Sequence, residues 1–217
     1  MIARSFILWL HGLGDSGPPN EVRIKTSFTS PEFVNTKWSF PSAPSQSVTC
    51  ENGAVIPSWF DVHKLPVTAF SPRDEKGVLE AVQSVHKIID EEITAGTNPD
   101  NIFVCGFSQG GALTLASVLL YPRTIGGGAV FSGFVPFDSD TNIIEQIPPD
   151  AKKTPILWIH GVADEEVLFE AGQEGPPFLE RAGVSWEFKA YPGLDHSVST
   201  DGLSYLETWI KARLRSS

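Results

Sequence analysis

Residues 102–111 read Ile-Phe-Val-Cys-Gly-Phe-Ser-Gln-Gly-Gly, and this stretch decides how the rest of the 217-residue chain is interpreted. The solid apolar run Ile102–Cys105 predicts a buried strand. The small and apolar residues of Gln109–Tyr121 predict a helix that stops at Pro122. Ser108 then stands on a sharp strand-to-helix turn, where a glycine on either side leaves room for a strained backbone and the helix N-terminus favours negative charge. We interpret Ser108 as a nucleophile; the alternative is a glycine-rich turn that contains a serine by chance.

The same order of apolar run, turn and helical pattern recurs along the chain. Further strands are predicted at Ser5–Leu10, Lys37–Phe40, Gly128–Phe131, Ile156–Ile159 and Ser185–Tyr191. Further helices are predicted at Asp74–Ala95, Glu165–Ala182 and Leu203–Leu214. Strands that alternate with helices and are mostly solid apolar runs without polar alternation predict an α/β fold, with a mostly parallel central sheet of about six to seven strands and helices on both faces. We expect one domain over residues 1–217, with its chemistry at the carboxyl ends of the strands.

The composition excludes several classes of function. The formal net charge of -10 disfavours binding to nucleic acid and to anionic membranes. No apolar run is long enough for a transmembrane helix. The start Met1–Leu10 has no signal-peptide cleavage site and runs straight into a His-Gly turn, so we interpret it as a strand. Cys50 and Cys105 make neither a disulfide framework nor a metal cluster. We expect a cytoplasmic protein without a metal or cofactor and without stable membrane insertion.

Five histidines compete for the role of a base that activates the serine. His86 lies in the middle of a predicted helix, and His63 precedes the nucleophile, outside the order expected for this fold. His11 and His160 each end a strand before a glycine, a position that more often shapes a turn. His196 follows the last strand in a loop that can reach the serine, so we predict it as the base. The alternative is a loop histidine without a role.

An acid is needed to orient the histidine and to stabilise its charged form. Asp164 lies just past the carboxyl end of the strand Ile156–Ile159, where the fold requires a carboxylate. Glu165, Glu166 and Asp195 are the alternatives. Asp195 has a short side chain that is poorly placed to approach the ring of the next residue, and we predict Asp164.

The glycine-rich loop His11–Gly17 follows the first strand. Such a loop can point a backbone N–H at a developing oxyanion, together with the N–H of the residue after the nucleophile. Leu13 and Gln109 are therefore the predicted donors. A phosphate-binding loop is the rival, but the required Gly-Lys-Ser/Thr ending is missing.

Six ordered motifs make the chain resemble the acyl-protein thioesterase and lysophospholipase-like carboxylesterase family of α/β-hydrolases. They are His11–Gly17 (HGLGDSG), Phe40–Pro44 (FPSAP), Ile56–Asp61 (IPSWFD), Gly106–Gly111 (GFSQGG), His160–Asp164 (HGVAD) and Gly193–Ser197 (GLDHS). The resemblance implies metal-free hydrolysis of acyl esters or thioesters, with S-acylated proteins or lysophospholipids as substrates. It carries over Ser108, Asp164 and His196 as a catalytic triad and Leu13 and Gln109 as oxyanion donors. We expect a weak homodimer at most.

The resemblance also implies an acyl-chain groove beside Ser45–Ile56. The predicted substrate-binding residues are Val48, Val55, Ile56, Trp59, Phe134 and Val167. The alternative is that the apolar residues of this segment simply pack onto the core. Phe134 stands where the family often has a Trp, and Glu165-Glu166 replaces small apolar residues, so two acids near the pocket rim disfavour anionic substrates. Two other functions stay open: a carboxylesterase for small soluble esters, and a non-catalytic receptor with a hydrolase fold.

Overall fold

A single six-stranded sheet, in which all neighbouring strands run parallel, forms the centre of the computed structural model, which describes residues 4–138 and 142–215. Its strands are β1 (Ser5–Leu10), β2 (Thr36–Ser39), β5 (Ile102–Phe107), β6 (Gly127–Phe131), β7 (Ile156–Gly161) and β8 (Trp186–Tyr191). Their order is β2-β1-β5-β6-β7-β8, which places β5 and the turn after it within the sheet rather than at its edge. The predicted α/β fold is confirmed, and each of the six expected strands is present.

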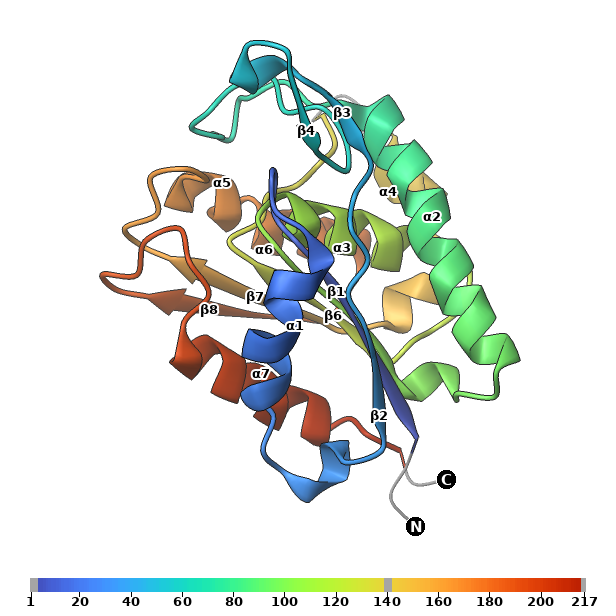
Figure 1. Cartoon of the computed structure of the whole chain (residues 1–217). Coiled ribbons are helices and arrows are strands. Elements are labelled where there is room, and N and C mark those ends of the chain that lie inside the picture. Colours follow the sequence, from blue (N-terminus) through green and yellow to red (C-terminus); the bar gives the residue numbers. More distant parts are fainter. Residues whose placement is uncertain (1–3, 139–141, 216–217) are drawn as a thin grey trace.

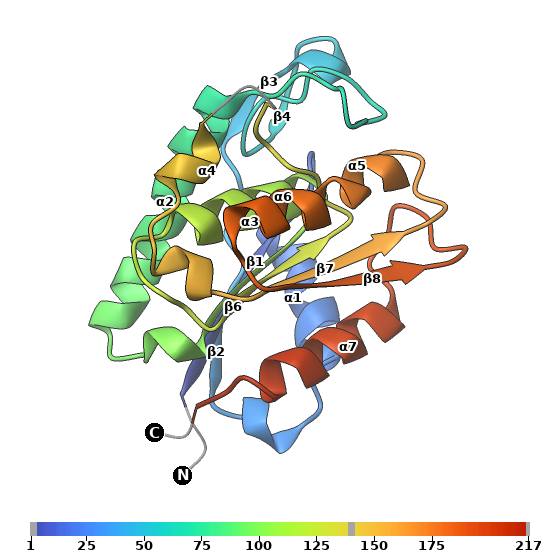
Figure 2. The ribbon, with the colours of Figure 1, turned by 180° about the vertical axis from the view of Figure 1, so that it is seen from behind.

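Helices cover both faces of the sheet (Figures 1 and 2). One face carries α2 (Glu75–Thr94), α3 (Gln109–Leu120), α4 (Ile143–Gln146), α5 (Phe169–Gln173) and α6 (Gly175–Ala182), and the other carries α1 (Gly17–Thr26) and α7 (Thr200–Lys211). Successive strand residues point to opposite faces, so on β1 Leu8 joins the first core layer and Ile7 the second. Both layers are apolar, which explains why the inner strands β1, β5, β6 and β7 show no polar alternation, whereas the edge strands β2 and β8 include polar residues.

Segment 165–182, predicted as one helix, instead forms a turn followed by the two short helices α5 and α6. The N–H groups of Glu166 and Val167 donate to Asp164 Oδ1 at 3.0 and 2.9 Å, which stabilises the turn. Further along, Pro176 and Pro177 lack the N–H groups that would continue α5, and the helix restarts at Gly175. The prediction of one continuous helix was wrong for these two reasons.

A hairpin and the helices α1 and α4 were not predicted. Segment 45–57 forms an antiparallel hairpin of β3 (Ser45–Val48) and β4 (Ala54–Pro57), whose turn places Asn52 and Gly53 at φ 54° and 78°. Helix α1 buries only Gly17 and Ile24, so it has no apolar periodicity to detect. Within residues 4–138 and 142–215, no helix is both long and apolar enough to cross a membrane.

Candidate active site

Ser108 lies on the turn between β5 and α3 with a strained backbone, at φ 55° and ψ −121°. The turn is too crowded for side chains at the neighbouring glycines. A Cβ added to Gly106 would lie 2.2 Å from the carbonyl oxygen of Gly110, and one added to Gly110 would lie 2.2 Å from the carbonyl oxygen of Leu10. Only glycine fits at both positions, and the serine side chain is thereby held out of the sheet.

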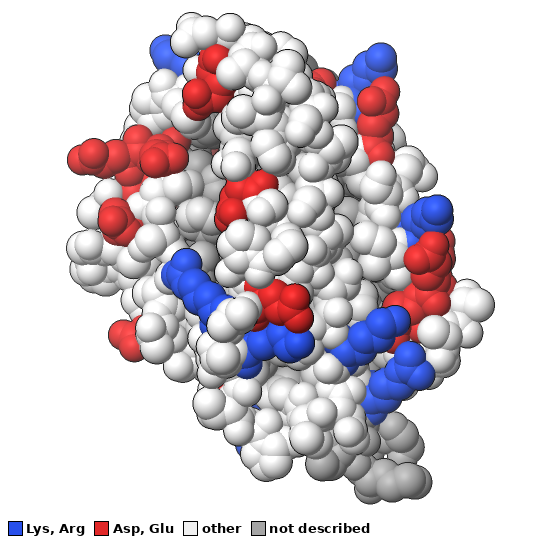
Figure 3. Space-filling view, viewed as in Figure 1, with Lys and Arg blue, Asp and Glu red and all other residues white. Residues whose placement is uncertain are grey.

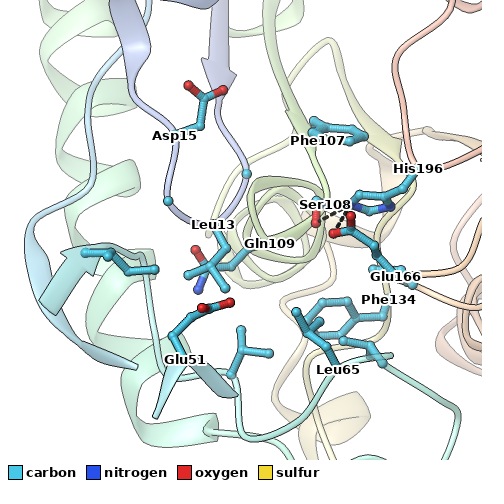
Figure 4. A pocket seen from close by; sticks show the side chains of 16 residues that line it. Leu13, Asp15, Glu51, Leu65, Phe107, Ser108, Gln109, Phe134, Glu166 and His196 are labelled. Atoms are coloured by element: carbon cyan, nitrogen blue, oxygen red, sulfur yellow. Dashed lines mark hydrogen bonds and ion pairs between the residues drawn. The ribbon is translucent and has the colours of Figure 1, made fainter. Parts of the chain in front are cut away.

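Three polar side chains, each from the turn or loop after a different strand, form one hydrogen-bonded chain at this turn. His196, in the loop after β8, accepts a hydrogen bond at Nε2 from Ser108 Oγ over 2.9 Å (Figure 4). Its Nδ1–H donates to Asp164 Oδ2, in the turn after β7, over 2.8 Å. This geometry leaves Nε2 free of a proton and able to take one from the serine.

Asp164 is held as a carboxylate. Its side chain is buried, which raises the pKa of its carboxyl group, but the hydrogen bond and charge of His196 and the N–H groups of Val167 and Glu166 outweigh that effect and lower the pKa overall. The group therefore stays ionised throughout the neutral range, as the acceptor for Nδ1–H must.

His11 and His160 are buried and hold loops in place. His11 Nδ1–H donates to the carbonyl of Gly12 over 2.7 Å, and its Nε2 accepts from the N–H of Ala43 over 2.9 Å. His160 Nε2–H donates to the carbonyl of Val167 over 2.9 Å. Burial lowers the pKa of both imidazoles, so both are neutral.

Of the remaining competitors, Glu166 approaches His196 at Nε2, with Oε2 4.0 Å away, and not at Nδ1, which is bonded to Asp164. The others, which the structure also describes, make no hydrogen bond to Ser108 or His196. His86 Nε2–H donates to the carbonyl of Ser117, and His63 is exposed beside Asp61 at 3.8 Å. Asp195 accepts a hydrogen bond from Ser197 Oγ, and Glu165 is exposed to solvent. All five histidines lie in the described ranges, and only His196 reaches Ser108.

The two predicted oxyanion donors flank the serine. Leu13 lies in the loop after β1, and Gln109 opens α3, where the first N–H groups of a helix have no intrahelical acceptor. The Gln109 side chain is buried and fully hydrogen-bonded. Its Oε1 accepts from the N–H of Trp59 over 3.0 Å, and its Nε2 donates to Ser58 Oγ and to the carbonyl of Phe60 over 2.8 and 2.6 Å. These bonds tie the segment after β4 to the start of α3.

A cavity of about 380 Å³ opens at the serine and contains both candidate donors (Figure 4). Of the six predicted substrate-binding residues, Ile56, Phe134 and Val167 line this cavity.

The other three lie elsewhere. Val48 is fully buried in the core, which is the packing role that sequence analysis left open. Val55 is 69% exposed and does not line the cavity. Trp59 is buried behind the first loop, where its Nε1–H donates to the carbonyl of His11 over 2.9 Å and its ring borders a separate cavity beside α2.

Sequence analysis missed Leu65 and Val67, which also line the cavity. They belong to an irregular loop that is joined to the turn after β7: the N–H of Val67 donates to the carbonyl of Glu166 over 2.7 Å, and that of Leu168 donates to the carbonyl of Val67 over 3.0 Å. This pairing joins segments a hundred residues apart, and nothing in the local sequence indicates it.

Arg73 joins two of the loops that line the cavity through hydrogen bonds to their carbonyl groups. Its guanidinium donates to the carbonyls of Thr68, Ser71 and Val135 at 3.0, 2.6 and 2.8 Å. The same group lies 5.0 Å from the centre of the Phe134 ring, in cation–π geometry. Arg73 therefore connects the loop that carries Leu65 and Val67 to the loop that carries Phe134.

Comparison with known proteins agrees with this fold. Residues 2–214 match the family described as Phospholipase/Carboxylesterase. The chain is 66% identical over 216 residues to "Carboxylesterase SOBER1" of Arabidopsis thaliana, covering 100% of this chain and 93% of that protein. It is 36% identical over 219 residues to "Acyl-protein thioesterase 1" of Saccharomyces cerevisiae, covering 99% and 95%.

Solved structures agree as well. The crystal structure of Arabidopsis thaliana SOBER1 superposes with a TM-score of 0.95 at 66% identity, covering 98% of this chain and 100% of that one. The expected resemblance is confirmed. The chain belongs to the phospholipase/carboxylesterase family of α/β-hydrolases, which includes carboxylesterases and acyl-protein thioesterases, and it is a hydrolase of esters.

Proposed function

We propose that the chain hydrolyses carboxylic esters or thioesters of acyl chains through a covalent acyl-enzyme, with Ser108 as nucleophile, His196 as general base and Asp164 as its orienting acid. The observation that carries this proposal is the unbroken chain from Ser108 Oγ through His196 to Asp164, with links of 2.9 and 2.8 Å, at the mouth of a cavity. The strained backbone of the serine supports it further, since such strain gathers at functional sites.

The reaction proceeds in two halves. Ser108 Oγ attacks the carbonyl carbon while its proton passes to His196 Nε2, and the oxyanion accepts hydrogen bonds from the N–H groups of Leu13 and Gln109. Collapse breaks the bond to the alcohol or thiol, which leaves with the proton held on Nε2. Water then attacks the acyl-enzyme, its proton passing through His196, which releases the acid and restores the serine.

Pre-steady-state hydrolysis of p-nitrophenyl acetate tests this mechanism. A covalent intermediate gives a burst of nitrophenolate with an amplitude near one equivalent of enzyme whenever deacylation is the slower half. Ser108→Ala removes the burst and the steady-state turnover. A non-catalytic receptor with this fold would show neither in the unmodified protein, and Ser108→Ala would then change nothing.

The acyl chain lies along the apolar part of the cavity. Ile56, Leu65 and Phe134 line this part. Each methylene fully buried there contributes up to about 0.8 kcal/mol, or close to fourfold in kcat/KM. We expect kcat/KM for p-nitrophenyl esters to rise over the first added carbons and then level off where the chain reaches solvent. A two-carbon ester that outperforms the six- and eight-carbon esters would favour the small-ester carboxylesterase instead.

A further inference from the structure

The cavity at Ser108 is acidic. Its described lining includes the carboxylates of Asp15, Glu51 and Glu166, and neither a lysine nor an arginine. In Figure 3 the charged side chains over and beside α5 are acidic, whereas acidic and basic side chains lie next to one another over α1 and α2. A substrate that enters this cavity therefore meets negative charge.

The three carboxylates are not equivalent. Asp15 accepts hydrogen bonds from the N–H of Ser16 and from Asn20 Nδ2 at 2.7 and 2.8 Å, and it points away from the serine (Figure 4). Glu166 lies directly beside the reacting groups, with Oε2 4.0 Å from His196 Nε2. Within the described residues, no lysine or arginine lies within 4.0 Å of Glu51 or Glu166. Glu51 and Glu166 therefore keep their charge available to a substrate.

Glu166 is placed to contact the leaving group of a substrate rather than its acyl chain. His196 Nε2 must come within hydrogen-bond distance of the leaving oxygen or sulfur to protonate it. The next few atoms of the leaving group consequently lie within a few ångströms of Glu166 Oε2. The Glu166 side chain is 63% exposed, so a charged group of the substrate can stay partly hydrated beside it. The apolar part of the cavity around Ile56 and Phe134 would instead desolvate such a group.

We propose that Glu166 makes this site select esters and thioesters whose leaving group carries a positive charge close to the scissile bond. This inference rests on the proposed serine-hydrolase function and specifies its substrate class. An ammonium or other cation two or three bonds beyond the leaving atom comes within ion-pairing distance of Glu166, a neutral group of the same shape gains nothing, and an anion is repelled.

Two acetate esters of nearly equal shape test this selectivity. Acetylcholine carries a quaternary ammonium group where 3,3-dimethylbutyl acetate carries a neutral tert-butyl group. The measured quantity is the ratio of their kcat/KM values, each divided by the rate constant for hydroxide-catalysed hydrolysis. We expect a ratio of up to about five at low ionic strength for the unmodified protein, because an exposed pair of opposite charges contributes at most about that factor.

Glu166→Gln should lower the ratio to between one and two, since it removes the charge and keeps the shape. Glu165→Gln is the matched control, because Glu165 is the adjacent exposed carboxylate and does not line the cavity, and it should keep the ratio of the unmodified protein. Sodium chloride at 0.5 M should lower the ratio of the unmodified protein and of Glu165→Gln, but hardly that of Glu166→Gln.

A ratio at or below one in the unmodified protein, or an equal ratio in Glu166→Gln, would overturn the inference. If the neutral ester is hydrolysed and the cationic ester is not preferred, the charge selectivity is wrong and the proposed hydrolase function still holds. Absence of turnover with both esters and with p-nitrophenyl acetate contradicts the proposed function as well.

Discussion

Replacement of Asp164 by asparagine should disable the base while leaving the fold intact, and the structure predicts how. Two N–H groups, of Glu166 and Val167, converge on Asp164 Oδ1 at 3.0 and 2.9 Å. An asparagine at this position must place its carbonyl oxygen toward these donors, because its amide nitrogen cannot accept from them. The amide NH2 then faces His196 Nδ1.

His196 Nδ1 must then accept a hydrogen bond from that NH2 group. The imidazole proton therefore moves to Nε2, where it faces Ser108. In that tautomer His196 cannot take the serine proton. The same substitution in another triad enzyme lowers kcat by about 10⁴, and we expect a loss of that order here, which corresponds to about 5 kcal/mol of transition-state stabilisation. Because the two side chains have the same shape, the melting temperature should change far less than the activity.

The assay is kcat for p-nitrophenyl acetate, with thermal unfolding measured in parallel. Asp195→Asn and Glu165→Gln are matched controls, because both remove a carboxylate near the site that does not contact His196 Nδ1. Both should keep kcat within about threefold of the unmodified protein. Near-normal activity in Asp164→Asn, with a large loss in either control, would show that the wrong carboxylate had been assigned.

Three further predictions follow from the same geometry. Activity should rise with pH, because His196 must be neutral to take the serine proton, and His196→Ala should remove both the rise and the activity; full activity with an unchanged pH dependence of kcat/KM in this variant would move the base elsewhere. Activity should survive exhaustive EDTA treatment, since the triad needs no Lewis acid and no three metal-ligating side chains gather within residues 4–138 or 142–215; loss on chelation that one divalent metal reverses would contradict this. Arg73→Lys should lower the free energy of unfolding in urea by about 1–3 kcal/mol, because a lysine cannot satisfy three carbonyls with the same geometry, whereas the exposed Arg181→Lys should have little effect; equal midpoints for both would refute the role of Arg73.

Most of the fold could be predicted because a parallel sheet covered on both faces requires solid apolar strands. The run 102–105 and its counterparts in β1, β6 and β7 carry that signal plainly, the edge strands β2 and β8 less so, and Gly106 and Gly110 mark the turn that holds Ser108. Once β5 is identified, the order of the remaining elements restricts the base to a late loop. His196 was accessible to sequence reasoning for this reason.

The cavity walls were harder to predict, since they depend on the faces of a hairpin that was not expected. Val55 and Ile56 are neighbours on β4, and successive strand residues point to opposite sides, so one is 69% exposed and the other lines the cavity. Without that strand, the apolar residues of the segment could not be sorted. Leu65 and Val67 reach the site only through pairing with the turn after β7, a contact between distant segments that local patterns do not encode.

The helical prediction over residues 165–182 failed for a related reason. Asp164 uses the N–H groups of Glu166 and Val167 for its own carboxylate, so this part of the chain forms a turn that serves the candidate site. Local propensity favours a helix there, and the tertiary role of Asp164 overrides it.

The central claim is that one activated serine carries the reaction, and mapping the adduct of a fluorophosphonate probe tests it most directly. The probe reacts with a serine whose hydroxyl is deprotonated by a neighbouring base and whose oxyanion is stabilised. We expect one equivalent of probe per chain, located by peptide mapping on Ser108, and no labelling of Ser108→Ala. An adduct on any other serine, or undiminished labelling of Ser108→Ala, would contradict the account.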